Sequence, residues 1–184
     1  MSATCASHQP LGAIFAILKL NCIKKENNYD IFINCLMDSQ EFKKVFSEIA
    51  IRHGFEQSFG ALFKESNDCI LALILRKSDY SNLYYLRIKV NLRSAFGKSF
   101  VKNKEWVKHD IAHIILGVGN QYDDLFDLER LIDDLSRKRK IEELFIKDII
   151  PLTENALSIR GLINSHNKGE VLLVPAIKAE LGLN

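Results

Sequence analysis

Two histidines four residues apart, in His109-Asp-Ile-Ala-His113, are the residues whose types and spacing most suggest chemistry. On a helix, this spacing lets two imidazoles share a zinc ion, and the residue after the first histidine acts as a general base. Here that residue is Asp110 rather than Glu, and no third ligand follows at a recognisable spacing. Because Trp106 to Leu116 has the pattern of a strand, the two histidines would instead lie about 13 Å apart. We therefore expect no metal or cofactor, and a metal-dependent hydrolase or nuclease using His109, Asp110 and His113 is kept as the alternative function.

Three other features resemble pieces of catalytic sites. Gly117-Val-Gly119 has neither the third glycine of a dinucleotide loop nor the Gly-Lys-Ser/Thr ending of a P-loop. Moreover, the acidic start of the helix expected after it would repel a phosphate. Ser78 has no Gly-x-Ser-x-Gly context, so its hydroxyl is expected to bond the backbone of a turn. Cys69 begins an apolar run and is expected to be a small buried hydrophobic residue. These observations favour a protein that is not an enzyme.

A group of basic and aromatic residues predicts a binding surface instead. The apolar run Cys69 to Leu75, the polar turn Arg76 to Asn82 and the alternating run Tyr84 to Leu92 predict two paired strands. The first strand is expected to be buried on both faces, and the second to have one solvated face. The residues expected to contact a partner, on that face or at the turn, are Arg76, Lys77, Tyr85, Arg87, Lys89 and Arg93. Such a mixture suits an acidic protein or a single-stranded nucleic acid, although charges on a solvated sheet face also serve solubility alone.

The composition is that of an ordinary globular protein. The 184 residues are 47% hydrophobic and 26% charged, so one folded domain with a substantial core is expected and disorder is not. The net charge of +2 gives no overall attraction to nucleic acid. The four cysteines have no CxxC spacing, which favours a reducing cytoplasm. The longest early apolar run, Leu11 to Leu20, is too short to span a membrane, for which about 20 residues are needed.

The chain is expected to divide at Met37. Just after it, Asp38 has the position of a helix N-cap, and Gly54 has that of the residue following the helix end. Residues 1–36 show no capping signals and no sustained periodicity. We therefore predict a poorly organised N-terminal appendage over 1–36 and a single domain over 37–184. The alternative is that the early apolar run forms a genuine strand or helix that packs on the domain.

The remaining patterns predict an α+β fold. A short hairpin is expected around Gly60, followed by the paired strands, a loop and a further strand over Trp106 to Leu116. From Asp123 the period becomes helical, with acidic residues first and Arg137 to Lys140 at the basic end. Pro151 is expected to begin a new helical turn, followed by further short helices. The predicted architecture is an N-terminal helix, an antiparallel sheet of about four to five strands, and a helical C-terminal third packed on one sheet face.

Several of these segments together resemble a known family. They are Asp38-Ser-Gln-Glu-Phe-Lys-Lys-Val-Phe, Gly54-Phe55, Phe63-Lys-Glu, Lys77-Ser78, the tyrosine-rich strand and Ile150-Pro-Leu152. Over roughly Met37 to Leu183, the chain resembles the bacterial family catalogued as domain of unknown function 4304. It departs from the family's pattern at Leu75-Arg76, where a Gln is expected before Lys77. The resemblance implies a small bacterial cytoplasmic α+β protein, and it implies no activity.

A non-enzymatic protein-binding module is therefore the function that we expect. An immunity protein that neutralises a toxin is one concrete form, suggested by the size of the chain and the bacterial resemblance. Weak nucleic-acid binding through the basic sheet face is a further alternative. The expected partner is a protein of unknown identity and not a membrane.

Overall fold

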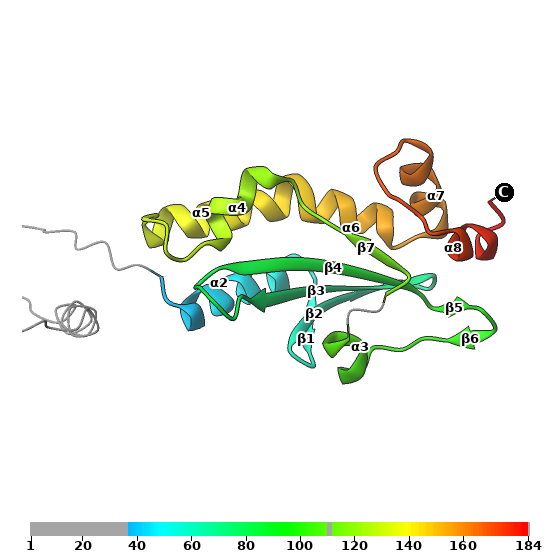
Figure 1. Cartoon of the computed structure of the whole chain (residues 1–184), viewed down its shortest axis with the longest axis horizontal. Helices are drawn as coiled ribbons and strands as arrows, with labels where there is room; N and C mark the ends of the chain where they lie inside the picture. Colours follow the sequence, from blue (N-terminus) through cyan, green and yellow to red (C-terminus); the bar gives the residue numbers. More distant parts are fainter. Residues whose placement is uncertain (1–36, 110–111, 184) are drawn as a thin grey trace, which may run out of the picture. The chain divides into compact units, whose positions relative to one another are not determined.

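The computed structural model describes residues 37–109 and 112–183, which form an α+β fold (Figure 1). The predicted appendage over 1–36 and the candidate residue Asp110 lie outside these described residues. In chain order the elements are α2 (Ser39–Arg52), β1 (Glu56–Ser58), β2 (Ala61–Glu65), β3 (Cys69–Lys77), β4 (Tyr84–Leu92), β5 (Ser94–Ala95), β6 (Lys98–Ser99), α3 (Lys104–Lys108), β7 (Ile114–Leu116), the 3₁₀ turn η1 (Asn120–Tyr122), α4 (Asp123–Phe126), α5 (Asp134–Leu144), the π-helical turn η2 (Phe145–Ile149), α6 (Ile150–Ala156), α7 (Ile159–Asn167) and α8 (Pro175–Glu180). Within the described part of the chain, every helix is too short or too polar to cross a membrane.

The described strands confirm the predicted antiparallel sheet. Five of them pair in the order β1-β2-β3-β4-β7, and β5 and β6 form a separate small hairpin. The predicted hairpin of β3 and β4 is paired from Cys69 opposite Leu92 to Lys77 opposite Tyr84. Because side chains alternate along a strand, this register gives the sheet two distinct faces. We call the face with Leu73 the inner face, and the other the outer face.

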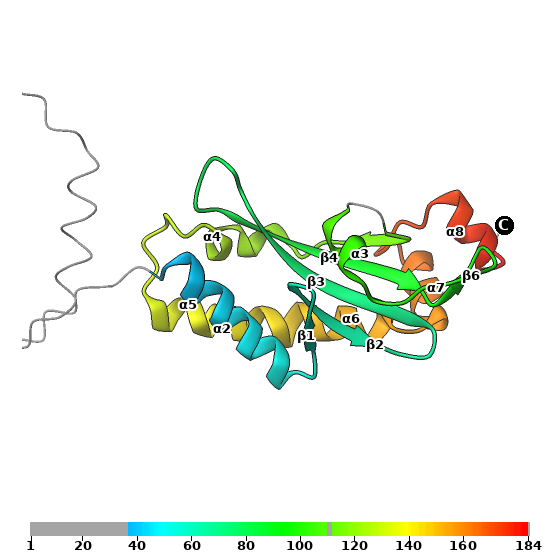
Figure 2. The same cartoon turned by 90° about the horizontal axis from the view of Figure 1, so that it is seen from below.

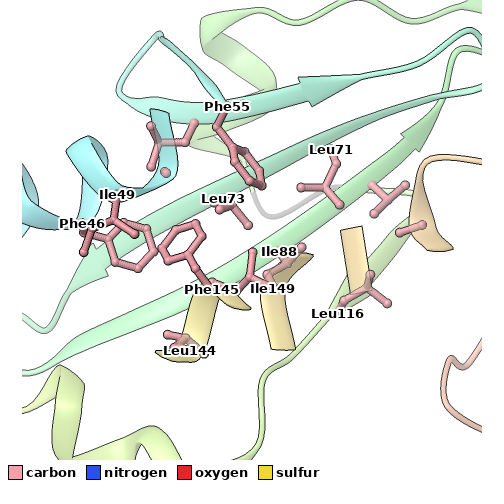
Figure 3. Close-up of a cluster of buried hydrophobic side chains, with 14 of the residues drawn as sticks. Phe46, Ile49, Phe55, Leu71, Leu73, Ile88, Leu116, Leu144, Phe145 and Ile149 are labelled. Carbon is pink, nitrogen blue, oxygen red and sulfur yellow. The ribbon is translucent and has the colours of Figure 1, made fainter. Parts of the chain in front are cut away.

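The inner face packs against most of the helices. Phe46 of α2 and Phe145 of η2 are fully buried, and their ring centroids lie 5.1 Å apart. They belong to one cluster with Leu73 and Ile88 of the sheet (Figure 3). Asp38 caps α2, as predicted, by accepting hydrogen bonds from the backbone of the first turn. The first helix and the helical C-terminal third therefore pack against the sheet as expected.

The helical C-terminal third contains a change of helix type just before a proline. Pro151 has no backbone N–H and cannot donate to the carbonyl four residues earlier. In the turn before it, the Ile150 N–H donates to the Phe145 carbonyl, five residues back, which is the π-helical pattern. The chain continues directly into α6, so that α5, η2 and α6 follow one another on one side of the sheet (Figure 1). The predicted new turn at Pro151 is confirmed.

The prediction of one helix from Asp123 to Lys140 is wrong. The helix α4 ends at Phe126, and α5 begins only at Asp134. Arg137, predicted at a helix end, is instead fully buried inside α5, and it donates to the carbonyls of Leu125 (2.5 Å) and Arg130 (3.0 Å). A helix as short as α4 is not stable by itself. The buried guanidinium therefore holds α4 and the connection after it against α5.

The prediction of one strand over Trp106 to Leu116 is also wrong. Residues Lys104–Lys108 form the helix α3, and among the described residues that follow, Ile114–Leu116 form the strand β7. Asn103 caps α3, because its side-chain oxygen accepts from the Trp106 N–H at 2.8 Å. Figure 1 shows α3 on the opposite side of the sheet from α5 and α6, and Figure 2 shows it lying against the sheet near β4. The outer face is thus partly covered rather than fully solvated.

Candidate functional site

Lys89, one of the residues predicted to contact a partner on a solvated face, is buried. Only 1% of its surface is exposed. Its ammonium group donates to the carbonyl oxygens of Trp106, at 2.9 Å, and of His109. The last carbonyls of a helix have no partner within that helix, so a cation at this end satisfies them. Lys89 therefore fastens the end of α3 to the sheet, which corrects the prediction that this side chain faces solvent.

Two further residues of the predicted set lie away from the part of the outer face that α3 covers. Lys77 is paired with Tyr84, whose side chain packs in the inner core, so Lys77 belongs to the inner side of the register. Arg93 follows the far end of β4, where its guanidinium donates to the Glu65 carboxylate at 2.5 Å and to the Ser66 carbonyl at 2.6 Å. The predicted residues therefore do not form one continuous surface.

The other three predicted residues do share one surface. Arg76 and Tyr85 are direct cross-strand partners on the outer face, and Arg87 is the next residue of β4 on that face. The Arg76 guanidinium donates to the Lys108 carbonyl at 2.7 Å, which brings the end of α3 beside them. The surface so formed consists of Arg76, Tyr85, Arg87, Lys108 and His109, and we call it the hairpin–α3 surface.

The hairpin–α3 surface is basic and carries an accessible aromatic ring. Tyr85 is 52% exposed, and the side chains of Lys108 and His109 are 57% and 65% exposed. Among the described residues, Glu105 pairs with this surface, because its carboxylate lies 3.5 Å from the Lys108 ammonium and 3.3 Å from the His109 ring. Arg76, Arg87 and Lys108 bring three permanently charged cations to this surface. Aromatic and arginine side chains are enriched at protein interfaces, and here the half-buried Arg76 and Arg87 lie beside the exposed Tyr85.

The contribution of α3 to this surface was missed by the sequence analysis. Two signals for it are present in the sequence. Asn103 is a favourable N-cap, and Glu105 and Lys108 have the charge order that suits the helix dipole. The neighbouring apolar residues Trp106 and Val107 instead suggested a strand. In the structure these two side chains pack on a small outer-face cluster that includes Phe63.

The two histidines of the candidate metal motif have different environments. His109 lies on the surface beside Glu105, whereas His113 is half-buried and its Nδ1 accepts the Leu92 N–H at 3.0 Å. The His113 ring also packs edge-on against Phe100, with centroids 4.5 Å apart, and burial lowers its pKa below the ordinary value. Among the described residues, no group of three His, Cys, Asp or Glu side chains could hold a metal ion. The metal-dependent alternative stays a prediction, because Asp110 is outside the described residues.

Two of the other candidates, Ser78 and Cys69, have structural roles. The Ser78 hydroxyl oxygen accepts the Tyr80 N–H at 3.2 Å, which confirms its predicted role in the turn. Cys69 is fully buried, and burial raises the pKa of its thiol to about 12, so it stays protonated at neutral pH. Gly117 and Gly119 line a cavity beside α6, and the segment leads through the 3₁₀ turn η1 into the acidic start of α4, as expected.

Comparisons with known proteins gave no match. No family model matches the chain, and neither the curated proteins nor the solved structures contain a significant match to it. The resemblance to the family of domain of unknown function 4304 therefore stays a prediction based on the sequence motifs.

Proposed function

We propose that this chain is a non-enzymatic protein-binding module that recognises an acidic partner protein through the hairpin–α3 surface. The observation that carries the proposal is the bond from the Arg76 guanidinium to the Lys108 carbonyl. It joins two segments distant in the sequence and places Lys108 next to the arginines of the hairpin. A negatively charged surface would gain favourable contacts with all three cations at once.

The surface is held in place before any partner binds. Lys89 fixes the end of α3, and Trp106 and Val107 pack beneath it on the sheet. A preformed surface loses less conformational freedom on binding than a mobile one. The planar guanidinium of Arg87 suits bidentate contact with a carboxylate, and Tyr85 offers a large exposed area with few rotatable bonds.

A bacterial cytoplasmic setting is part of the proposal. It follows from the family resemblance and from the cysteine pattern, and the buried thiol of Cys69 is compatible with a reducing compartment. An immunity protein is one form of such a module, since a protein that neutralises a toxin binds it without performing a reaction. The hairpin–α3 surface would then contact an acidic region of the toxin.

Charge reversal on this surface tests the proposal. The wild-type chain, the double variant Tyr85→Ala with Lys108→Glu, and the control Lys98→Glu would each be immobilised and exposed to extract of the source cell. Lys98 is an exposed lysine of the separate β5–β6 hairpin, so its reversal makes a similar change in charge elsewhere. Bound proteins would be measured by quantitative mass spectrometry. We expect a protein that is retained by wild type and control and reduced at least tenfold by the double variant.

Two results would reject the proposal. Equal retention by the double variant and the control would remove the hairpin–α3 surface from any binding role. Loss of retention after nuclease treatment of the extract would show that the surface binds RNA or DNA, which attract basic and aromatic residues by the same chemistry.

A further inference from the structure

One edge of the sheet, formed by the three-residue strand β7, lacks the charged residues and proline that often protect an edge against strand pairing. Exposed edges are normally protected by short length, charged residues, proline or a covering segment. At the β1 edge, Glu56 and Gln57 are polar, and the Lys102 ammonium lies 2.9 Å from the Glu56 carboxylate. At the opposite edge, β7 and the following residues to Gly119 contain no charged residue and no proline. Ile115, in the middle of β7, is 57% exposed.

The backbone of Ile115 points away from the sheet. Peptide groups alternate between the two sides of a strand. Leu92 directs its N–H toward β7, because it donates to His113, and Arg93 directs its N–H toward the β2–β3 turn, because it donates to the Asp68 carbonyl. By alternation, the backbone N–H and C=O groups of Val90 and Ile88 also point toward β7. There Val90 pairs with Ile114, and Ile88 pairs with Leu116.

Ile115 lies between those two pairs. Its N–H and C=O are therefore directed outward, and among the described residues no backbone or side-chain group outside the β4 ladder bonds to them. The sheet thus ends in an available donor and acceptor on β7.

A groove lies directly beside this edge. Its volume is about 420 Å³, within the range of ligand sites, and its walls are Leu116 to Gly119 on one side and α6 and α7 on the other. The apolar part includes Leu152 and Leu162, and the acidic part includes Asp148 and Glu170. The lysine of the groove, Lys147, is paired with Glu143, and Asp148 accepts a hydrogen bond from the Tyr122 hydroxyl, which carries no charge. The groove therefore favours an occupant with apolar and positively charged side chains.

We propose that an extended peptide segment of another protein adds to β7 as a further strand. Its main chain bonds to Ile115, while side chains on one of its faces enter the groove. One of these side chains is apolar, and a Lys or Arg of the peptide reaches Asp148 or Glu170. This mode of binding is β-augmentation, in which backbone bonds give affinity and alternate side chains give specificity.

A second copy of this chain fits the site less well. The corresponding stretch of a second chain, Ala112 to Gly119, contains no Lys or Arg to match the acidic groove. The proposal is also independent of the hairpin–α3 surface, since the two sites share no residue. Failure of one would leave the other standing.

The probe would be a phage-displayed library of random decapeptides, which would be selected against the full chain. We expect the selected peptides to have apolar residues at alternate positions and to contain Lys or Arg. Synthetic peptides of these sequences should bind Ile115→Pro at least tenfold more weakly than the control Ile115→Val. Proline removes only the outward N–H at this edge position, so the β4 ladder is kept. Glu170→Lys should weaken binding to a similar extent without altering the strand.

Several outcomes would overturn the proposal. They are the absence of any selected peptide, unchanged binding by Ile115→Pro, and a wild-type dimer in sedimentation that Ile115→Pro dissociates. Should Ile115→Pro fail to fold, peptides N-methylated at alternate residues decide. Methylation of the residues whose N–H groups point toward β7 must abolish binding, whereas methylation of the intervening residues must leave it unchanged. Equal affinity of the two sets of peptides rejects strand addition.

Discussion

The two faces of the sheet are covered by different means. On the inner face, helices bury large apolar side chains such as Phe46 and Phe145, so hydrophobic packing supplies the stability. On the outer face, a five-residue helix is held by a few apolar contacts and by the buried ammonium of Lys89. The first arrangement resists change through packing, while the second depends on specific hydrogen bonds. The difference explains how one face serves as the core and the other keeps charged residues near its surface.

The largest expected effect comes from the inner face. Phe145→Ala removes a fully buried ring that packs against Phe46, Phe55 and His53. We expect a loss of about 3–5 kcal/mol in the free energy of unfolding, measured by urea denaturation. The neighbouring Ile146 is 56% exposed, so Ile146→Ala should cost less than about 1 kcal/mol. Similar losses for both variants would contradict the view that packing on the inner face dominates stability.

A smaller and more local effect is expected on the outer face. Lys89→Met removes the ammonium and leaves the carbonyls at the end of α3 without their partner. We expect a loss of about 1.5–3 kcal/mol, together with a red shift of tryptophan emission as α3 loosens. Trp106 is the sole tryptophan of the chain, so the emission reports on α3 directly. The control is Lys104→Met on the exposed start of α3, and an unshifted spectrum for Lys89→Met would show that Lys89 does not hold the helix.

The smallest effect concerns pH. Burial lowers the pKa of His113 below its ordinary value of 6.5, and the charge of Glu180 opposes this shift. In acid, the unfolded chain binds a proton that the folded chain resists, so stability falls as the pH decreases below about 6.5. His113→Gln keeps an acceptor for the Leu92 N–H and should reduce this pH dependence, measured as unfolding free energy at pH 5.5 and 7.5. A variant that loses stability in acid as steeply as wild type would contradict this role of His113.

The sequence correctly predicted the elements whose own residues show a clear helical or strand periodicity. The helix α2, bracketed by Asp38 and Gly54, and the hairpin of β3 and β4 are both as expected. The errors fall on α3 and α4, which are too short for a periodic signal. Each is held by a buried cation from a different element, Lys89 for α3 and Arg137 for α4. The support from these cations leaves no periodic pattern in the sequence, so the capping and charge signals of α3 were outweighed by its apolar residues.

The candidate site was predicted in part for the same reason. Alternation along β4 correctly placed Tyr85 and Arg87 on one face. It could not show that α3 covers Lys89 or that Lys108 joins the surface, because both depend on where α3 lies. The open edge at β7 was hidden by the same misassigned strand.

Photo-crosslinking can detect partner binding at the hairpin–α3 surface without a known ligand. A benzophenone side chain would replace Tyr85 in one sample and Leu135, which is 78% exposed on α5, in the control. After irradiation in extract of the source cell, mass spectrometry would identify the attached proteins. We expect one dominant acidic protein attached at position 85 and absent at position 135, with attachment lost when Lys108→Glu is added. The same proteins attached at both positions, or an attachment unaffected by Lys108→Glu, would contradict this expectation.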